Sequence, residues 1–189
     1  MIQYPVPLLG FSAYSGTGKT HLLQKLLPIL KNKGLTIAVI KHAHHSFEVD
    51  QPGKDSYQLR SAGADQVLVA SRKRIAMIRE MREEAGEPAL EEVLHCLDPA
   101  QLDLVLVEGY KRAAFPKIEL HRRALGKPLL HPHDRHIIAV AADTPLETSL
   151  PQLDINQPEK IAQFIFWFID QHRSSEHAEP YHPHCSQLR

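Results

Sequence analysis

Four segments of this chain are apolar without the polar alternation of a half-exposed strand. They are residues 7–13, 36–40, 102–107 and 136–141. Continuous apolar runs of this length are typical of parallel strands that are covered on both faces. We therefore expect these four segments to form the centre of a mostly parallel sheet.

Two further segments have apolar residues at helical spacing. Residues 19–33 predict a helix that ends at Gly34, where a left-handed cap fits, and Pro28 should kink it. The last helix has the clearest start, because Asn156 and Glu159 have capping-box spacing and Pro158 suits a first turn. Its apolar stripe is Ile161, Phe164, Ile165, Phe168 and Ile169.

Shorter elements complete the pattern. We expect a helix from Asp55 or Ser56 to near Gly63, two antiparallel strands at 66–70 and 75–78, and a helix over 90–97. Residues 117–122 read as another strand. Alternating strands and helices predict a three-layer α/β fold, in which helices flank a mostly parallel central sheet that has some antiparallel strands.

Composition narrows the class of protein. The chain has 189 residues, which suit one domain, and its 22 Lys+Arg balance 22 Asp+Glu, so no overall charge favours nucleic acid or an anionic membrane. Cys96 and Cys185 form no CxxC pair, and we see neither a signal peptide nor an apolar stretch long enough to cross a bilayer. We expect a cytoplasmic protein without nucleic-acid or membrane partners.

The most specific motif lies between the first strand and the first helix. Ser15-Gly16-Thr17-Gly18-Lys19-Thr20 has the glycines, lysine and hydroxyl of a phosphate-binding loop of the P-loop NTPase fold. Backbone N–H groups and the lysine hold the phosphates in such a loop, and the hydroxyl binds Mg²⁺. Ala13 stands where the motif normally opens with glycine; a methyl group is tolerated there if the backbone stays in its allowed region.

Carboxylates at the ends of neighbouring strands would complete a magnesium-nucleotide site, because ligands lie there in open α/β sheets. Glu108 ends one strand and Asp50 follows another. We expect Thr20, Asp50 and Glu108 to lie near the metal, with Asp50 and Glu108 as catalytic candidates. Asp143 is a candidate for binding the N1–H and 2-amino groups of guanine, although it could equally be a turn or helix-cap residue.

Several segments together resemble a known family. The segments SGTGKT, IKHAHHSFEVDQPGKDSYQLRSAGA, LDLVLVEGYK, and RHIIAVAAD followed by LDIN are similar to the MobB family of molybdopterin-guanine dinucleotide biosynthesis adapters. The resemblance covers about residues 7–171 and implies a SIMIBI-type, GTP-binding homodimer with Mg²⁺ and at most slow GTPase activity. It implies a partnership with the guanylyltransferase that attaches GMP to molybdopterin, and with molybdopterin-loaded proteins as further candidates. It also places Lys54 and Asp55 in the nucleotide-binding PGKDS loop.

Two other functions stay open. A P-loop kinase acting on a small molecule would need a basic lid, and no lid segment is recognisable. A metallochaperone GTPase is suggested by the 13 histidines. They cluster at His42, His44 and His45, at His131, His133 and His136, and at His182 and His184 beside Cys185. The ordinary alternatives are loop histidines near phosphates and an adventitious chelator in the tail.

The chain is expected to end in a tail. We expect residues 1–172 to form the P-loop nucleotide-binding domain and residues 173–189, which are polar and contain proline, to form a disordered histidine-containing tail. Trp167 lies beside the apolar stripe of the last helix. We expect it at or near the interface of the dimer that the resemblance implies.

Overall fold

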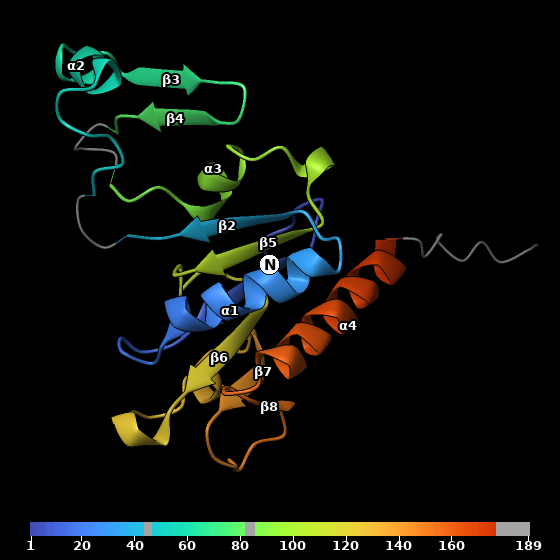
Figure 1. Ribbon diagram of the computed structural model, residues 1–189. Coiled ribbons are helices and arrows are strands. Elements are labelled where there is room, and N and C mark those ends of the chain that lie inside the picture. Colours follow the sequence, from blue (N-terminus) through green and yellow to red (C-terminus); the bar gives the residue numbers. More distant parts are fainter. Residues whose placement is uncertain (44–46, 82–85, 177–189) are drawn as a thin grey trace, which may run out of the picture. The chain divides into compact units, whose positions relative to one another are not determined.

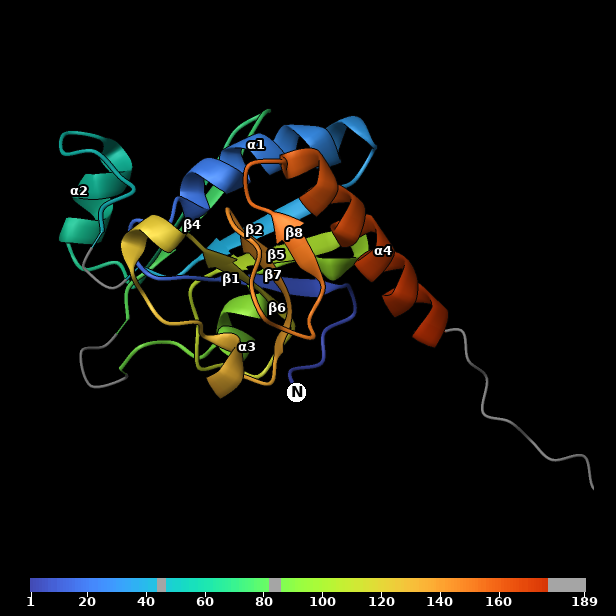
Figure 2. The same cartoon turned by 90° about the horizontal axis from the view of Figure 1, so that it is seen from below.

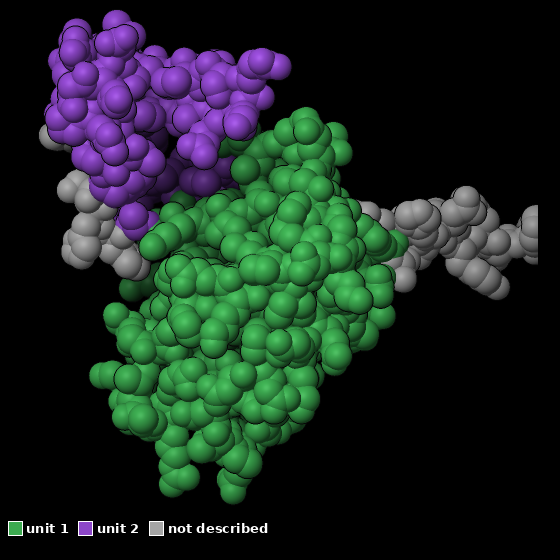
Figure 3. All heavy atoms as spheres, viewed as in Figure 1, with its two compact units in different colours: residues 1–42, 95–189 green, residues 43–94 purple. Residues whose placement is uncertain are grey.

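The computed structural model describes residues 1–43, 47–81 and 86–176, with side chains up to residue 173. The chain divides into two compact units, which Figure 3 colours separately: residues 1–42 with 95–189, and residues 43–94. The phosphate-binding motif, Glu108 and Asp143 belong to the first unit. Asp50, Lys54 and Asp55 belong to the second.

The first unit is built on a six-stranded parallel sheet with the order β2-β5-β1-β6-β7-β8 (Figure 1). The strands are β1 (Leu8–Ser12), β2 (Ile37–Lys41), β5 (Leu104–Glu108), β6 (Lys117–His121), β7 (Ile137–Ala142) and β8 (Gln152–Asp154). The predicted α/β class and mostly parallel sheet are confirmed. Because β1 pairs with β5 on one edge and β6 on the other, its carboxyl end is the switch point at which such sheets bind ligands.

Two long helices, α1 (Lys19–Asn32) and α4 (Pro158–Glu176), lie side by side on one face of this sheet (Figure 2). Their buried side chains share a core with the strands; they include Leu22, Leu26 and Leu30 of α1 and Ile161, Ile165 and Ile169 of α4. The first helix is continuous through Pro28. The apolar positions that predicted both helices are therefore the positions whose side chains are buried in the core.

The last helix has Pro158 in its first turn, as predicted, and extends further than the sequence predicts. It begins at Pro158, and the Asn156 amide oxygen accepts hydrogen bonds from Arg122. It continues past residue 172 to Glu176, where the Arg173 guanidinium lies 3.0 Å from Asp103 Oδ1. Residues 177–189, most of the expected tail, lie outside the described residues.

The opposite face of the sheet buries two charged side chains of β6. Lys117 and Glu119 are 0% and 1% exposed. Lys117 Nζ donates to Asp134 Oδ2 at 2.6 Å and to the Lys111 carbonyl oxygen at 2.9 Å. Burial raises the pKa of Asp134, but hydrogen bonds from Lys117 Nζ and the His136 N–H outweigh it, so the pKa lies below its usual value.

Glu119, the second buried charge of β6, also binds the segment between β6 and β7. Its carboxylate accepts hydrogen bonds from the backbone N–H groups of Leu130 and His131, at 2.7 and 2.9 Å, and lies 3.0 Å from His131 Nδ1. A buried carboxylate needs such partners, since an isolated charge in the interior is costly. The two residues of β6 thus fasten the segment between β6 and β7 to the sheet.

The second unit contains α2 (Asp55–Ser61), the antiparallel strands β3 (Gln66–Ala70) and β4 (Ile75–Arg79), and α3 (Leu90–Leu94). The antiparallel pair is confirmed, and α3 is shorter than the predicted 90–97. Arg60 of α2 pairs with Glu48 at 2.6 Å and with Glu80 at 2.8 Å. Apolar side chains of the hairpin are exposed, including Leu68, Val69, Ile75 and Met77.

Candidate nucleotide-binding site

The phosphate-binding motif connects β1 to α1, as predicted. Gly16 and Gly18 have φ values of +81° and +94°, which glycine adopts without strain and other residues adopt rarely. Thr17 is 2% exposed, and its Oγ1 donates to the Tyr14 carbonyl oxygen at 2.8 Å. The loop is therefore a tight turn that leads directly into the N-terminus of α1, where phosphate groups bind favourably.

Ala13 fits the loop without strain. Its methyl group is fully buried in the core of the first unit, and its backbone does not adopt a positive φ. Alanine is compatible with such a backbone, since only positive φ values make a Cβ costly. The departure from the usual opening glycine therefore leaves the turn of this motif intact.

Lys19 lies inside this turn. Its Nζ donates to the carbonyl oxygens of Ala13 and Tyr14, each at 3.3 Å. Burial lowers the pKa of Lys19, the Lys111 ammonium lowers it further, and the Glu108 carboxylate opposes both. Lys111 Nζ itself lies 5.7 Å from the centre of the Tyr14 ring. An anion bound at the loop would favour the charged form of Lys19.

Thr20 and Glu108 come together as the sequence predicts. Thr20 Oγ1 donates to Glu108 Oε1 at 3.3 Å, from the first turn of α1 to the end of β5. A hydroxyl and a carboxylate oxygen are ligands suited to Mg²⁺, which prefers hard oxygen donors. Gly109 has a φ of +110°, and a Cβ there would lie 2.5 Å from His42 Cβ, so only glycine allows this close approach.

Arg122, which follows β6, contacts the loop of the candidate site and was not predicted from the sequence. Its Nε donates to the Thr17 carbonyl oxygen at 3.2 Å, and both terminal nitrogens lie 3.2 Å from Asn156 Oδ1. Asp143 Oδ2 lies 3.9 Å from one of these nitrogens, and Asp143 Oδ1 accepts a hydrogen bond from the Arg123 N–H at 3.0 Å. The segments after β6, β7 and β8 are thus connected to the phosphate loop through Arg122. In the sequence, the feature that Arg122, Asp143 and Asn156 share is that each closely follows a strand.

Three predicted site residues belong to the second unit and are described within it. Asp50 Oδ1 accepts hydrogen bonds from Ser56 Oγ at 3.1 Å and from the Gln51 N–H at 2.9 Å. Lys54 directly precedes α2, and Asp55 lies in its first turn, where an acid is favourable. Their roles toward nucleotide and metal stay predictions.

The histidine clusters give little support for a metal centre. His44, His45, His182, His184 and Cys185 lie outside the described residues. Within residues 1–43, 47–81 and 86–173, no group of three or more His, Cys, Asp or Glu side chains is arranged to hold a metal ion. His131 instead binds the buried Glu119.

No helix within residues 1–43, 47–81 and 86–176 is long and apolar enough to cross a membrane.

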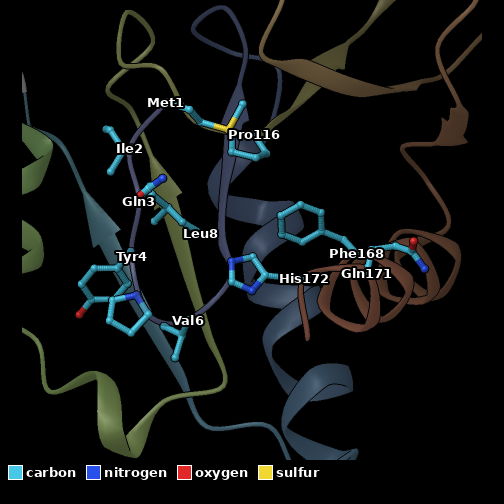
Figure 4. Close-up of a pocket in the computed structure, with 11 residues that line it drawn as sticks. Met1, Ile2, Gln3, Tyr4, Val6, Leu8, Pro116, Phe168, Gln171 and His172 are labelled. Atoms are coloured by element: carbon cyan, nitrogen blue, oxygen red, sulfur yellow. The ribbon is translucent and has the colours of Figure 1, made fainter. Parts of the chain in front are cut away.

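A cavity of about 740 Å³ lies in the first unit beside the segment that leads into β1 (Figure 4). Residues 1–6 and Leu8 line one side, and Phe168 and His172 of α4 line another. No residue of the phosphate loop lines it. Since the loop follows the carboxyl end of β1, this cavity is separate from the nucleotide-binding motif.

Comparison with known proteins identifies the family. The family model described as molybdopterin guanine dinucleotide synthesis protein B matches residues 8–143. The chain belongs to the MobB family. It is 48% identical over 161 residues to the molybdopterin-guanine dinucleotide biosynthesis adapter protein of Escherichia coli (strain K12), covering 85% of this chain and 91% of that relative. Its identity to the Haemophilus influenzae adapter is 44% over 160 residues, covering 85% and 88%.

Solved MobB structures share the fold. The crystal structure of a molybdopterin-guanine biosynthesis protein B is 30% identical, with a TM-score of 0.66 over 85% of this chain and 98% of that chain. A Bacillus subtilis MobB structure, at 20% identity, has a TM-score of 0.64 over 86% and 97%. At that lower identity the likeness concerns the fold alone. The resemblance drawn from the sequence is confirmed.

Proposed function

We propose that this protein is a molybdopterin-guanine dinucleotide biosynthesis adapter that binds GTP together with Mg²⁺. The observation that carries the nucleotide proposal is the phosphate-binding turn, with Thr20 Oγ1 and Glu108 Oε1 3.3 Å apart at its edge. The adapter role is supported by membership of the MobB family and by 48% identity to a relative of that name.

Each part of the loop has a distinct task in this proposal. The backbone N–H groups around Gly16 and Gly18 hold the phosphates, and Lys19 turns from its two carbonyl partners to the terminal phosphates. Thr20 and Glu108 hold the metal ion or its water. Bound Mg²⁺ neutralises charge on the phosphates. Asp50 stays a candidate for the same task from the second unit.

The protein works as a binding partner more than as a catalyst. We propose that its GTPase activity is slow, and that it acts as a cytoplasmic homodimer on the guanylyltransferase that attaches GMP to molybdopterin. Molybdopterin-loaded proteins are the second proposed class of partner. Nucleotide state then changes the complex with the partner enzyme, as in other P-loop proteins whose loops respond to the terminal phosphate.

Titration calorimetry with GTP and ATP in Mg²⁺ tests the nucleotide proposal. Lys19→Ala should abolish detectable triphosphate binding and leave the thermal unfolding curve in place, since charge-assisted contacts are worth about 1.5–3 kcal/mol each. Lys33→Ala, an exposed lysine at the other end of α1, is the matched control. Unchanged GTP affinity in a folded Lys19→Ala protein contradicts phosphate binding at this loop.

The adapter role is tested by adding the protein to purified guanylyltransferase and following the formation of molybdopterin guanine dinucleotide. The native protein with GTP should increase the rate, and Lys19→Ala should not. A rate that the native protein leaves unchanged argues against the adapter role, whatever the calorimetry gives.

A further inference from the structure

A small cavity of about 170 Å³ lies beside the phosphate loop. Gly18 and His21 line it from the loop and the first turn of α1, and Arg122, Asn156 and Pro158 line it from the segments that follow β6 and β8. Pockets for complete drug-sized ligands measure about 300–1,000 Å³. This cavity therefore has room for one end of a nucleotide and not for the whole molecule.

One contact and the order of the strands set the direction in which a nucleotide would lie across the loop. Thr20 meets Glu108 at the end of β5, on one edge of β1. Since Mg²⁺ accompanies the terminal phosphates, that edge takes the triphosphate end. β6 pairs with the opposite edge of β1, and β7 and β8 follow it. The nucleoside end accordingly extends toward β6 and β8, where the small cavity lies.

We propose that this cavity holds the purine base and that Asn156 determines which purine binds. The inference rests on the proposed nucleotide binding and goes beyond it in assigning the base site. Arg122 has only donors, and both of its terminal nitrogens lie 3.2 Å from Asn156 Oδ1, so the amide oxygen is fixed toward Arg122. Among the residues that the structure describes, Asn156 Nδ2 donates to none, which leaves its two N–H groups for a ligand.

The chemistry of two donors favours one kind of purine. The edge of a 6-oxopurine presents acceptors at O6 and N7, whereas adenine carries an amino donor at position 6. Asn156, as a donor to O6 and N7, therefore favours the binding of guanine over that of adenine. Arg122 Nε also donates to the Thr17 carbonyl oxygen, so the residue that orients Asn156 is itself fixed by the phosphate loop.

Asp143, the earlier candidate for guanine recognition, has a different place in this arrangement. Its carboxylate accepts from the Arg123 N–H and lies 3.9 Å from Arg122. It is not among the residues that line the small cavity. Asp143 thus supports Arg122, and Asn156 is the residue that faces the base.

The test compares Asn156→Asp with the native protein. The substitution keeps the shape, changes the hydrogen bonds from Arg122 into an ion pair, and replaces the two donors by acceptors. GTP affinity should fall about tenfold or more, while the affinities for ATP and for magnesium tripolyphosphate, which has no base, stay within a few-fold of native. Asn32→Asp, at the exposed end of α1, is the matched control and should change none of the three.

Inosine triphosphate adds an independent arm, because it keeps O6 and N7 and lacks the 2-amino group. It should bind the native protein far better than ATP does. The assignment of Asn156 is overturned by unchanged GTP affinity in Asn156→Asp, by an equal loss for GTP and ATP, or by inosine triphosphate that binds no better than ATP. A native protein that binds neither GTP nor tripolyphosphate overturns both this assignment and the proposed function, which separates the two failures.

Discussion

Glu108 is the residue on which the magnesium proposal depends. Its carboxylate lies 3.3 Å from the Thr20 hydroxyl, at the end of β5, the strand that pairs with β1 beside the switch point. Glu108→Gln keeps the shape and removes the charge, so Mg²⁺-dependent GTP binding should fall about 10–100-fold, the usual cost of altering a metal's surroundings. Binding measured in EDTA should change little.

Calorimetry in Mg²⁺ and in EDTA checks this expectation, with the exposed Glu159→Gln as the control. Equal losses in both buffers would give Glu108 a structural role, through its contact with Thr20, in place of a metal role.

Residue chemistry was predictable where it is local. Gly16, Gly18 and Lys19 lie within four positions of the sequence, and the turn needs glycine where φ is positive. The motif could therefore be recognised from the sequence alone. Arg122 and Asn156 are 34 positions apart and meet only because β6 and β8 end at the same edge of the sheet. No pattern along the chain records that contact, and the sequence alone therefore assigned Asn156 to a helix cap.

Strand β6 owes its place in the sheet to paired charges as well as apolar burial. Asp134→Asn leaves the Lys117 ammonium, whose side chain is 1% exposed, without its carboxylate. We expect a loss of about 3–5 kcal/mol in the free energy of unfolding, as is typical when one partner of a buried pair is removed. Urea unfolding measures it, and Asp65→Asn, at an exposed acid, should cost far less. Similar losses in both variants would contradict the buried pair.

The same pair predicts a pH dependence. The pKa of folded Asp134 lies below its usual value, so the carboxylate stabilises the native state above the unfolded pKa. That contribution is lost as pH falls through the folded pKa. The stability difference between the native protein and Asp134→Asn should therefore narrow in acid. A difference that stays constant from neutral pH to acid argues against an ionised Asp134.

Elements were predictable in proportion to their burial. The strands β1 and β5 are buried on both faces, and their apolar runs identified them. β8 has only three residues, Gln152–Asp154, too few for any pattern to appear. The end of α4 was placed too early, because the ion pair of Arg173 with Asp103 joins residues 70 positions apart. Long-range polar contacts set the boundaries that periodicity leaves undetermined.

At the scale of the whole molecule, the second unit is an insertion in the sequence between two strands that are neighbours in the sheet. Residues 43–94 separate β2 from β5, which pair in register in the sheet of the first unit. The sequence showed the elements of this segment and no compositional boundary around it. Its hairpin exposes Leu68 and Ile75, which are 63% and 71% exposed. Apolar side chains left exposed on a stable fold commonly mark a contact with another chain.

The proposed homodimer can therefore be tested at two surfaces. Trp167 is 53% exposed, and its ring centre lies 5.3 Å from that of Phe164, so α4 also offers an aromatic surface. If Trp167 lies at the interface, Trp167→Ala should weaken dimerisation about tenfold or more, because buried tryptophans carry much of an interface's energy. Sedimentation at micromolar concentration measures this beside the parent protein and Ile75→Ser.

The outcomes separate three arrangements of the chain. A monomeric parent contradicts the dimer itself. A parent dimer that only Ile75→Ser dissociates places the interface at the hairpin and removes Trp167 from it, whereas a dimer that only Trp167→Ala dissociates places it on α4. Because α4 packs against α1, which begins at the phosphate loop, an interface on α4 would connect dimerisation to the nucleotide site through the core that these helices share.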